Sequence, residues 1–197
     1  MKNTPPKRVS NQCFIALGAN LLSVCGSPKE SIVTAISAIS DQGFIEIRQS
    51  HFYRTPAFPK GNGPDYVNAV ISAQFQGESV DVMRALHSVE EMMGRTRQER
   101  WESRVIDLDL LAIDQHIVPD RDTFNTWMTL PLSEQKTRQP QELIVPHPRI
   151  QDRGFVLVPL ADVAPDWRHP ILNKTVLEML DALEVSEIAE IVQIAEV

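Results

Sequence analysis

Apolar and polar positions along the chain follow two periods, and the change between them marks out strands and helices. A mostly apolar run over residues 12–18 predicts a first strand, and Gly18 permits a tight turn at its end. Ser27 and Pro28 are suited to begin a helix, after which apolar residues recur every three or four positions as far as Gly43. The chain is therefore expected to begin with a strand followed by a helix.

Two more strands, a second helix and a fourth strand are expected next. The strands cover residues 44–54 and 65–75, on either side of a segment rich in proline and glycine. The helix runs from about Ser79 to Gly94, because its apolar residues share one face. Residues 105–114 (VIDLDLLAID) alternate as a half-buried strand does. The order β-α-β-β-α-β predicts a ferredoxin-like α+β fold, an antiparallel sheet flanked by helices.

The remainder of the chain is interpreted as an insertion and a C-terminal extension of the same domain. Residues 114–142 are polar and contain three prolines, which favours a long loop insertion. The stretch PHPRIQDRGFVLVPLADVAP predicts a compact turn and a short apolar helix, and residues 172–183 predict another helix. One domain spanning residues 1–197 is expected.

Composition excludes several classes of protein. The 197 residues carry a formal net charge of -7, and 43% of them are hydrophobic, which is ordinary for a globular domain. Two cysteines do not make a disulfide framework or a zinc site. The first ten residues lack an apolar signal region, and nowhere do 18 apolar residues run together. A cytoplasmic protein without membrane association is therefore expected.

Asp107 and Asp109 lie two residues apart in the fourth predicted strand, so they share one face. Carboxylates about 6 to 7 Å apart along a strand repel each other by roughly 2 to 3 kcal/mol at an effective dielectric near 20. A divalent cation removes that cost, and magnesium suits two carboxylates together with substrate phosphates better than zinc does. The alternative is a solvated strand face, which the two aspartates alone would favour.

Positive charge is concentrated directly before these aspartates. Residues 95–104 contain four arginines and two glutamates, a net charge of +2 in an otherwise acidic chain. Arginine binds phosphate oxygens bidentately, so this segment predicts a polyphosphate site. Trp101 offers a flat face to a heteroaromatic ring, although an isolated tryptophan is more often part of a core. A nucleic-acid partner is not expected, because the rest of the chain repels polyanions.

Several motifs occur in an order that is typical of one family. They are FIALGANL, FYRTPAF followed by PDYVNAV, then GRTR, RW and RVIDLDLL, and finally VPHPRIQDRGFVLVPL. In these motifs, over about residues 12–166, the chain resembles the 6-hydroxymethyl-7,8-dihydropterin pyrophosphokinases of folate biosynthesis. The resemblance implies a magnesium-dependent transfer of the β,γ-diphosphate of ATP to 6-hydroxymethyl-7,8-dihydropterin, with release of AMP. It also implies a monomer or a weak dimer.

The resemblance further implies roles for individual residues. Asp107 and Asp109 would hold two Mg²⁺ ions, and the groups acting in catalysis would be these two with Arg95, Arg97 and Arg104. The ATP contacts would be Glu90, Arg95, Arg97, Arg104, His147 and Arg153. The pterin contacts would be Thr55, Pro56, Phe58, Tyr66, Asn68, Trp101 and Phe155. Without the resemblance, ordinary structural interpretations compete: a core tyrosine, an edge asparagine, a surface histidine and a solvated helix glutamate.

Three features depart from the family's usual pattern. Glu102 and Ser103 stand where glycine and proline are usual. His87 stands where a glutamine is frequent near the adenine, and residues 114–142 are longer than the same connection in compact members. The alternative to an active enzyme is therefore a catalytically weak paralogue that binds ATP or pterin.

Overall fold

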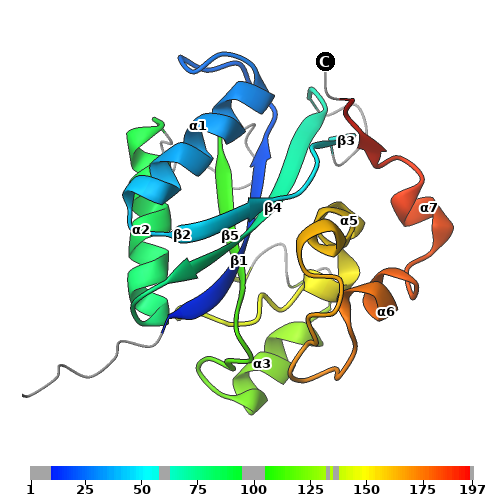
Figure 1. Ribbon diagram of the computed structural model, residues 1–197. Helices are drawn as coiled ribbons and strands as arrows, with labels where there is room; N and C mark the ends of the chain where they lie inside the picture. The colour runs from blue at the N-terminus through cyan, green and yellow to red at the C-terminus, as the bar shows by residue number, and fades with distance from the viewer. Residues whose placement is uncertain (1–9, 58–62, 95–104, 132–133, 135–137, 196–197) are drawn as a thin grey trace, which may run out of the picture.

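A sheet with helices on both faces makes up the protein (Figure 1). The computed structural model describes residues 10–57, 63–94, 105–131, 134 and 138–195. The six-stranded sheet has the order β5-β1-β4-β3-β6, with β2 also paired to β4, and all of these pairings are antiparallel. The strands are β1 (Asn11–Ala19), β2 (Ile45–Gln49), β3 (Tyr53–Thr55), β4 (Tyr66–Phe75), β5 (Asp107–Ile113) and β6 (Val192–Gln193).

The helices separate into two groups, each of which covers one face of the sheet (Figure 1). Ile15 and Leu17 of β1 pack in one core with α1 and α2, whereas Phe14 packs in a second core with α5 and α6. The α+β fold with a flanked antiparallel sheet is therefore confirmed. The helices are α1 (Pro28–Asp41), α2 (Ser79–Met92), α3 (Arg121–Met128), α5 (Gly154–Val163), α6 (Val176–Leu180) and α7 (Val185–Ile188), with a 3-10 turn η1 (Ile150–Asp152).

Helix α1 begins and ends where the sequence predicts. The Ser27 hydroxyl accepts from the Glu30 N–H, and the Glu30 carboxylate accepts from the Ser27 N–H at 2.7 Å. Ile32 on the apolar stripe is fully buried, and Gly43 follows the helix with a φ of +94°, which a residue without a side chain adopts without strain. None of the described helices is both long and apolar enough to cross a membrane.

The strand predicted over residues 44–54 is wrong as a single element, because Ser50 divides it into β2 and β3. Its N–H donates to the Val70 carbonyl, and its hydroxyl accepts from the Val70 N–H, both at 2.9 Å. The side chain thus replaces a backbone carbonyl in the ladder. As a result, β2 and β3 pair with different halves of β4.

The region after β5 is more ordered than the sequence predicts. Within 114–142, expected to be a loop, Asp120 caps helix α3, and its carboxylate accepts from the N–H groups of Asp122 and Thr123 at 2.9 Å. Phe124 on this helix is fully buried, with its ring centroid 5.5 Å from that of His169. The helix predicted over 172–183 is shorter, because Thr175 caps α6. The residues that follow form α7 and β6.

We expect His169 to lower folding stability as the pH decreases from 6.5 to about 4. Its imidazole is fully buried, its Nδ1 accepts from the N–H groups of Ile171 and Leu172 at 3.2 Å, and burial lowers its pKa to about 4. The unfolded chain takes up this proton near pH 6.5, and the folded chain takes it up only near the lowered pKa. Stability is thus present above pH 6.5 and declines by up to about 3 kcal/mol as pH falls to about 4.

Urea unfolding at several pH values tests this expectation. The variant His169→Asn keeps a hydrogen-bond acceptor but removes the titrating group, so its stability should depend less on pH across the window than that of the parent protein. Other titrating groups are common to both proteins and cancel in the difference. Equal slopes of stability against pH in the two proteins would contradict the assignment.

Candidate active site

Three strands bring polar residues together near one end of the sheet. Gly18 in β1 pairs with Asn68 in β4 on one side and with Asp107 in β5 on the other. Residues opposite each other in antiparallel strands point to the same face, so Asn68 and Asp107 share a face across this glycine. A Cβ at position 18 would lie 3.2 Å from Asn68 Oδ1. Gly18, expected in a turn, instead keeps open the space between these two side chains.

The predicted common face of the two aspartates is confirmed by the packing of their neighbours. Leu108 and Leu110 are buried in the core beneath α1 and α2. Asp107 and Asp109 therefore face the side of the sheet that α5 covers, and the Asp109 side chain is 42% exposed. In the described part of the chain no group of three or more His, Cys, Asp or Glu side chains could hold a metal ion. Two carboxylates alone fit magnesium, which takes its remaining ligands from phosphates and water.

Glu90 lies beneath β5 and is not solvated. Its side chain is 2% exposed, and its Oε1 accepts from the Leu108 N–H at 2.9 Å. The interpretation as a solvated helix glutamate is therefore wrong. The carboxylate fixes the backbone between Asp107 and Asp109, which gives Glu90 a positioning role; a contact with ATP stays a prediction.

A matched pair of variants tests the role of Glu90. Glu90→Gln keeps an oxygen for the Leu108 N–H, whereas Glu90→Ala leaves a buried donor without its acceptor, a loss of about 1 to 3 kcal/mol. The alanine variant should therefore unfold at lower urea concentration and lose turnover, and the glutamine variant should retain more of both. Equal stabilities of the two variants would contradict the proposed hydrogen bond.

Arg153 approaches the aspartates from the start of α5. Its Nη1 lies 3.6 Å from Asp109 Oδ2, and its guanidinium carbon lies 5.7 Å from the ring centroid of Phe155, which is 41% exposed. Burial lowers the pKa of Arg153, while Asp109 raises it. Arginine remains charged at any working pH, so this cation offers a phosphate-binding fork beside the carboxylate face.

His147 is held as a neutral imidazole. Its backbone N–H donates to the Leu111 carbonyl at 2.7 Å, and its Nδ1 accepts from the Arg149 N–H at 3.1 Å. Burial, followed by the charges of Arg153 and Arg149, holds the pKa of His147 well below its usual value. With Nδ1 as acceptor, the proton lies on Nε2, which is left as a donor.

Arg149 is a residue that sequence reasoning missed. Its Nε donates to Asp152 Oδ2 at 2.9 Å, and its charge is close enough to lower the pKa values of both His147 and Arg153. The PHPR stretch contained it, but nothing in its spacing separated it from a surface arginine.

The predicted pterin residues in the described chain lie on β3, β4 and α5, or directly after β3. Asn68 Nδ2 donates to Thr55 Oγ1 at 2.8 Å, and both side chains are buried. Tyr66 in β4 pairs with Thr55 in β3, and Pro56 follows Thr55 in the sequence. Phe155 belongs to α5, which packs against both strands. The other predicted residues lie outside the described residues: Phe58, Arg95, Arg97, Trp101 and Arg104.

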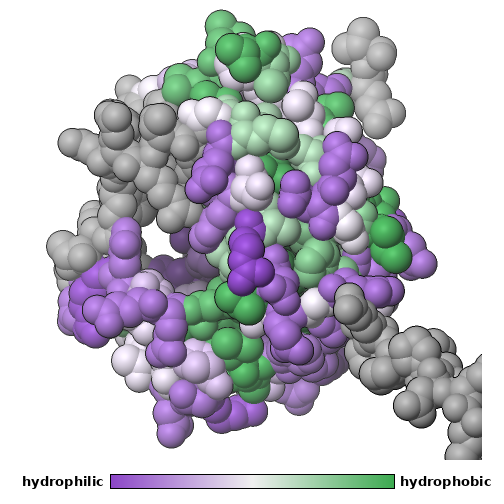
Figure 2. All heavy atoms as spheres, turned by 90° about the vertical axis from the view of Figure 1, so that its left-hand side faces the viewer, coloured by the Kyte–Doolittle hydropathy of each residue, from purple (hydrophilic) through white to green (hydrophobic). Residues whose placement is uncertain are grey.

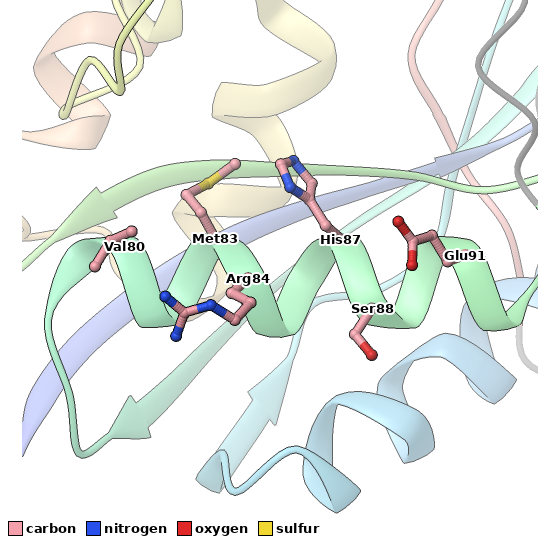
Figure 3. Close-up of a pocket in the computed structure, with 6 residues that line it drawn as sticks. All are labelled: Val80, Met83, Arg84, His87, Ser88 and Glu91. Carbon is pink, nitrogen blue, oxygen red and sulfur yellow. The ribbon is translucent and has the colours of Figure 1, made fainter.

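A hollow lies along the outer side of α2, on a mainly hydrophilic face of the protein (Figure 2). Figure 3 shows Met83 and His87 projecting from α2 to the same side, while Arg84 and Ser88 project elsewhere. His87, which departs from the family pattern, therefore lies on a concave surface. The described residues that line it are Val80, Met83, Arg84, His87, Ser88 and Glu91.

An antiparallel sheet that presents two carboxylates and a guanidinium on a helix-covered face fits an α+β protein that binds phosphates together with their cations. The model of the 7,8-dihydro-6-hydroxymethylpterin-pyrophosphokinase family matches residues 14–165, and the chain belongs to this family. It is a pyrophosphokinase of folate biosynthesis.

Two bacterial relatives support this assignment along most of the chain. The 2-amino-4-hydroxy-6-hydroxymethyldihydropteridine pyrophosphokinase of Synechocystis sp. is 29% identical over 185 residues, which cover 92% of this chain and 82% of that protein. The protein of the same name from Haemophilus influenzae is 30% identical over 172 residues, covering 85% of this chain and 92% of its own length.

Solved structures support the fold. The structure of wild-type Plasmodium falciparum HPPK-DHPS with pteroate matches with a TM-score of 0.62 and 13% identity, over 90% of this chain. This chain spans only 43% of that longer protein. At such low identity the likeness is one of fold alone.

Proposed function

We propose that this chain transfers the β,γ-diphosphate of ATP to the hydroxymethyl oxygen of 6-hydroxymethyl-7,8-dihydropterin and releases AMP. One observation carries the proposal. Asn68 and Asp107 flank Gly18 on one sheet face, and Arg153 lies 3.6 Å from Asp109 on that side. Groups suited to an aromatic heterocycle thus adjoin groups suited to phosphates and their cations.

Asp107 and Asp109 would hold the magnesium ions that accompany ATP. When bound, magnesium neutralises charge on the phosphates and favours in-line attack. Arg153 would bind phosphate oxygens beside the carboxylates, and the neutral His147 would donate from Nε2. Arg95, Arg97 and Arg104 would complete the phosphate contacts.

The pterin would bind on the β3 and β4 side of the site. The Asn68 amide is oriented by its hydrogen bond to Thr55, so it can offer both a donor and an acceptor to the edge of the ring. Tyr66, Pro56 and Phe155 would enclose the bicycle together with Phe58 and Trp101. The hollow beside Met83 and His87 would take the adenine.

No dedicated general base is needed in this proposal. The Nδ1 of His147 already accepts from the Arg149 N–H, and its low pKa makes the imidazole a poor proton acceptor. Rate acceleration would come from positioning the hydroxymethyl oxygen and from neutralising charge. One chain carries all of the residues proposed here, so a monomer suffices.

Turnover by the purified protein tests the proposal against a weak paralogue. ATP, magnesium chloride and the pterin alcohol should yield AMP at a rate that rises with magnesium and depends on the pterin. Tight binding of ATP or pterin by calorimetry, without AMP, would favour the paralogue. The absence of both binding and turnover would contradict each of these functions.

A further inference from the structure

The C-terminal residues 185–194 contact β3 and α5, two of the three elements that carry the described pterin residues. They follow the part of the chain that the family model matches, residues 14–165. Strand β6 pairs with β3, with Gln193 opposite Tyr53, and the Ile194 N–H donates to the Phe52 carbonyl at 2.8 Å. Figure 1 shows β6 beside β3, and α7 on the outer side of α5.

The same segment packs directly on the backbone at the start of α5. Gly154, which lies between Arg153 and Phe155 in the sequence, is buried. A Cβ at this glycine would lie 2.9 Å from the Glu187 carbonyl oxygen and 3.0 Å from Ile191 Cδ1, so a side chain would displace the segment. The backbone that carries Phe155 is thus in contact with residues close to the C-terminus.

Strand β3 depends on this segment for its second partner. It is three residues long, and without β6 it would be an edge strand held by β4 alone. Thr55 is its last residue and receives the hydrogen bond that orients Asn68. Pairing with β6 at Tyr53 and Arg54 therefore fixes the two residues that precede Thr55, from the side opposite β4.

A second connection joins α5, near its C-terminal end, to β3 and the residues just before it. Asp162 Oδ2 accepts from the Tyr53 hydroxyl at 2.9 Å and from the His51 N–H and Nδ1, each at 3.0 Å. This connection holds the later part of α5, whereas residues 185–194 hold its beginning. Helix α5 is thus fixed relative to β3 at two points, and the C-terminal contact is the one adjacent to Phe155.

We propose that residues 185–194 act as a brace that positions the pterin-binding residues. By holding β3 and the start of α5 together, the brace sets the spacing between Thr55 and Phe155 before substrate binds. A site held in its binding geometry loses less conformational freedom on binding a flat heteroaromatic ring, so the brace increases pterin affinity. The inference rests on the proposed function for the identity of the ring.

A matched pair of substitutions at Ile194 tests the brace. Ile194→Pro removes the N–H that donates to Phe52, and Ile194→Ala retains it. The proline variant should raise the KM for the pterin by about tenfold, with kcat and the KM for ATP changed less than about twofold. The alanine variant should stay near the parent in all three constants. Circular dichroism and thermal unfolding establish that both variants are folded at the assay temperature.

Gly154→Ala provides an independent route to the same effect, because its new methyl group displaces the segment from α5. It should also raise the KM for the pterin more than that for ATP. Combined with Ile194→Pro, it should add little, since both changes release the same segment. Additive effects would overturn the inference that they act through one brace.

A purely structural role would lower the unfolding temperature and leave the KM for the pterin unchanged, which would also overturn the inference. Equal increases in the KM values for pterin and ATP would do the same. The proposed function fails separately, through the absence of AMP formation in the parent protein. In that event, calorimetric binding of the pterin to the parent and to Ile194→Pro still measures the brace: weaker binding by the variant supports it, and equal affinity overturns it.

Discussion

Replacing Asp107 or Asp109 by alanine is expected to lower kcat/KM by at least about a thousandfold while the protein remains folded, because each change removes a proposed magnesium ligand. The two variants should differ in stability. Either loss relieves repulsion between the carboxylates and removes an attraction to Arg153, whose pKa both aspartates raise; the loss of Asp109 also breaks the 3.6 Å ion pair with Arg153. Both groups of that pair are partly exposed, so the difference should be within about 1 kcal/mol.

Steady-state kinetics and thermal unfolding of the metal-free proteins measure both effects. Asp41→Ala is a suitable control, because it removes the same charge from an exposed position in the last turn of α1. It should keep the parent kcat/KM. Turnover near the parent value in the Asp107 or Asp109 variant would contradict the metal assignment.

Arg153→Ala should lower kcat/KM for ATP by about a hundredfold, the second largest effect that we expect. Its guanidinium lies beside Asp109, at the face where the phosphates would bind. Arg153→Lys keeps the charge but loses the planar fork, so its kcat/KM should fall between those of the alanine variant and the parent.

The effect of Arg153 is measured by varying ATP at saturating pterin. Arg121→Ala, at the exposed start of α3, removes a positive charge elsewhere and should behave as the parent protein does. If Arg153→Ala changed only the KM for the pterin, the assignment of Arg153 to the ATP phosphates would be contradicted.

Elements governed by local signals could be predicted from the sequence. Ser27 with Glu30 defines the start of α1, and alternation of aspartate with leucine defines which face of β5 carries the carboxylates. The division between β2 and β3 could not be predicted, since it depends on a hydrogen bond between Ser50 and Val70 in another strand. Strand β6 could not be predicted either, because its two residues acquire a partner only when β3 is in place.

The candidate site shows the same distinction between local signals and contacts that form only on folding. The aspartate face follows from a local period, whereas the buried position of Glu90 depends on where α2 packs against β5. The neutral state of His147 depends on Arg149 and Arg153, whose placement around the imidazole follows from the turn before α5. The motifs identified the residues, and the three-dimensional structure supplies the hydrogen bonds and charges that define their states.

The identity of the reaction products tests the central claim most directly. Phosphorus-31 NMR of a reaction containing the parent protein, ATP, magnesium and the pterin alcohol should show AMP and pterin diphosphate in equal amounts. The same reaction with Asp107→Ala should show unchanged ATP. ADP, inorganic phosphate or free pyrophosphate as the main product of the parent protein would contradict the account.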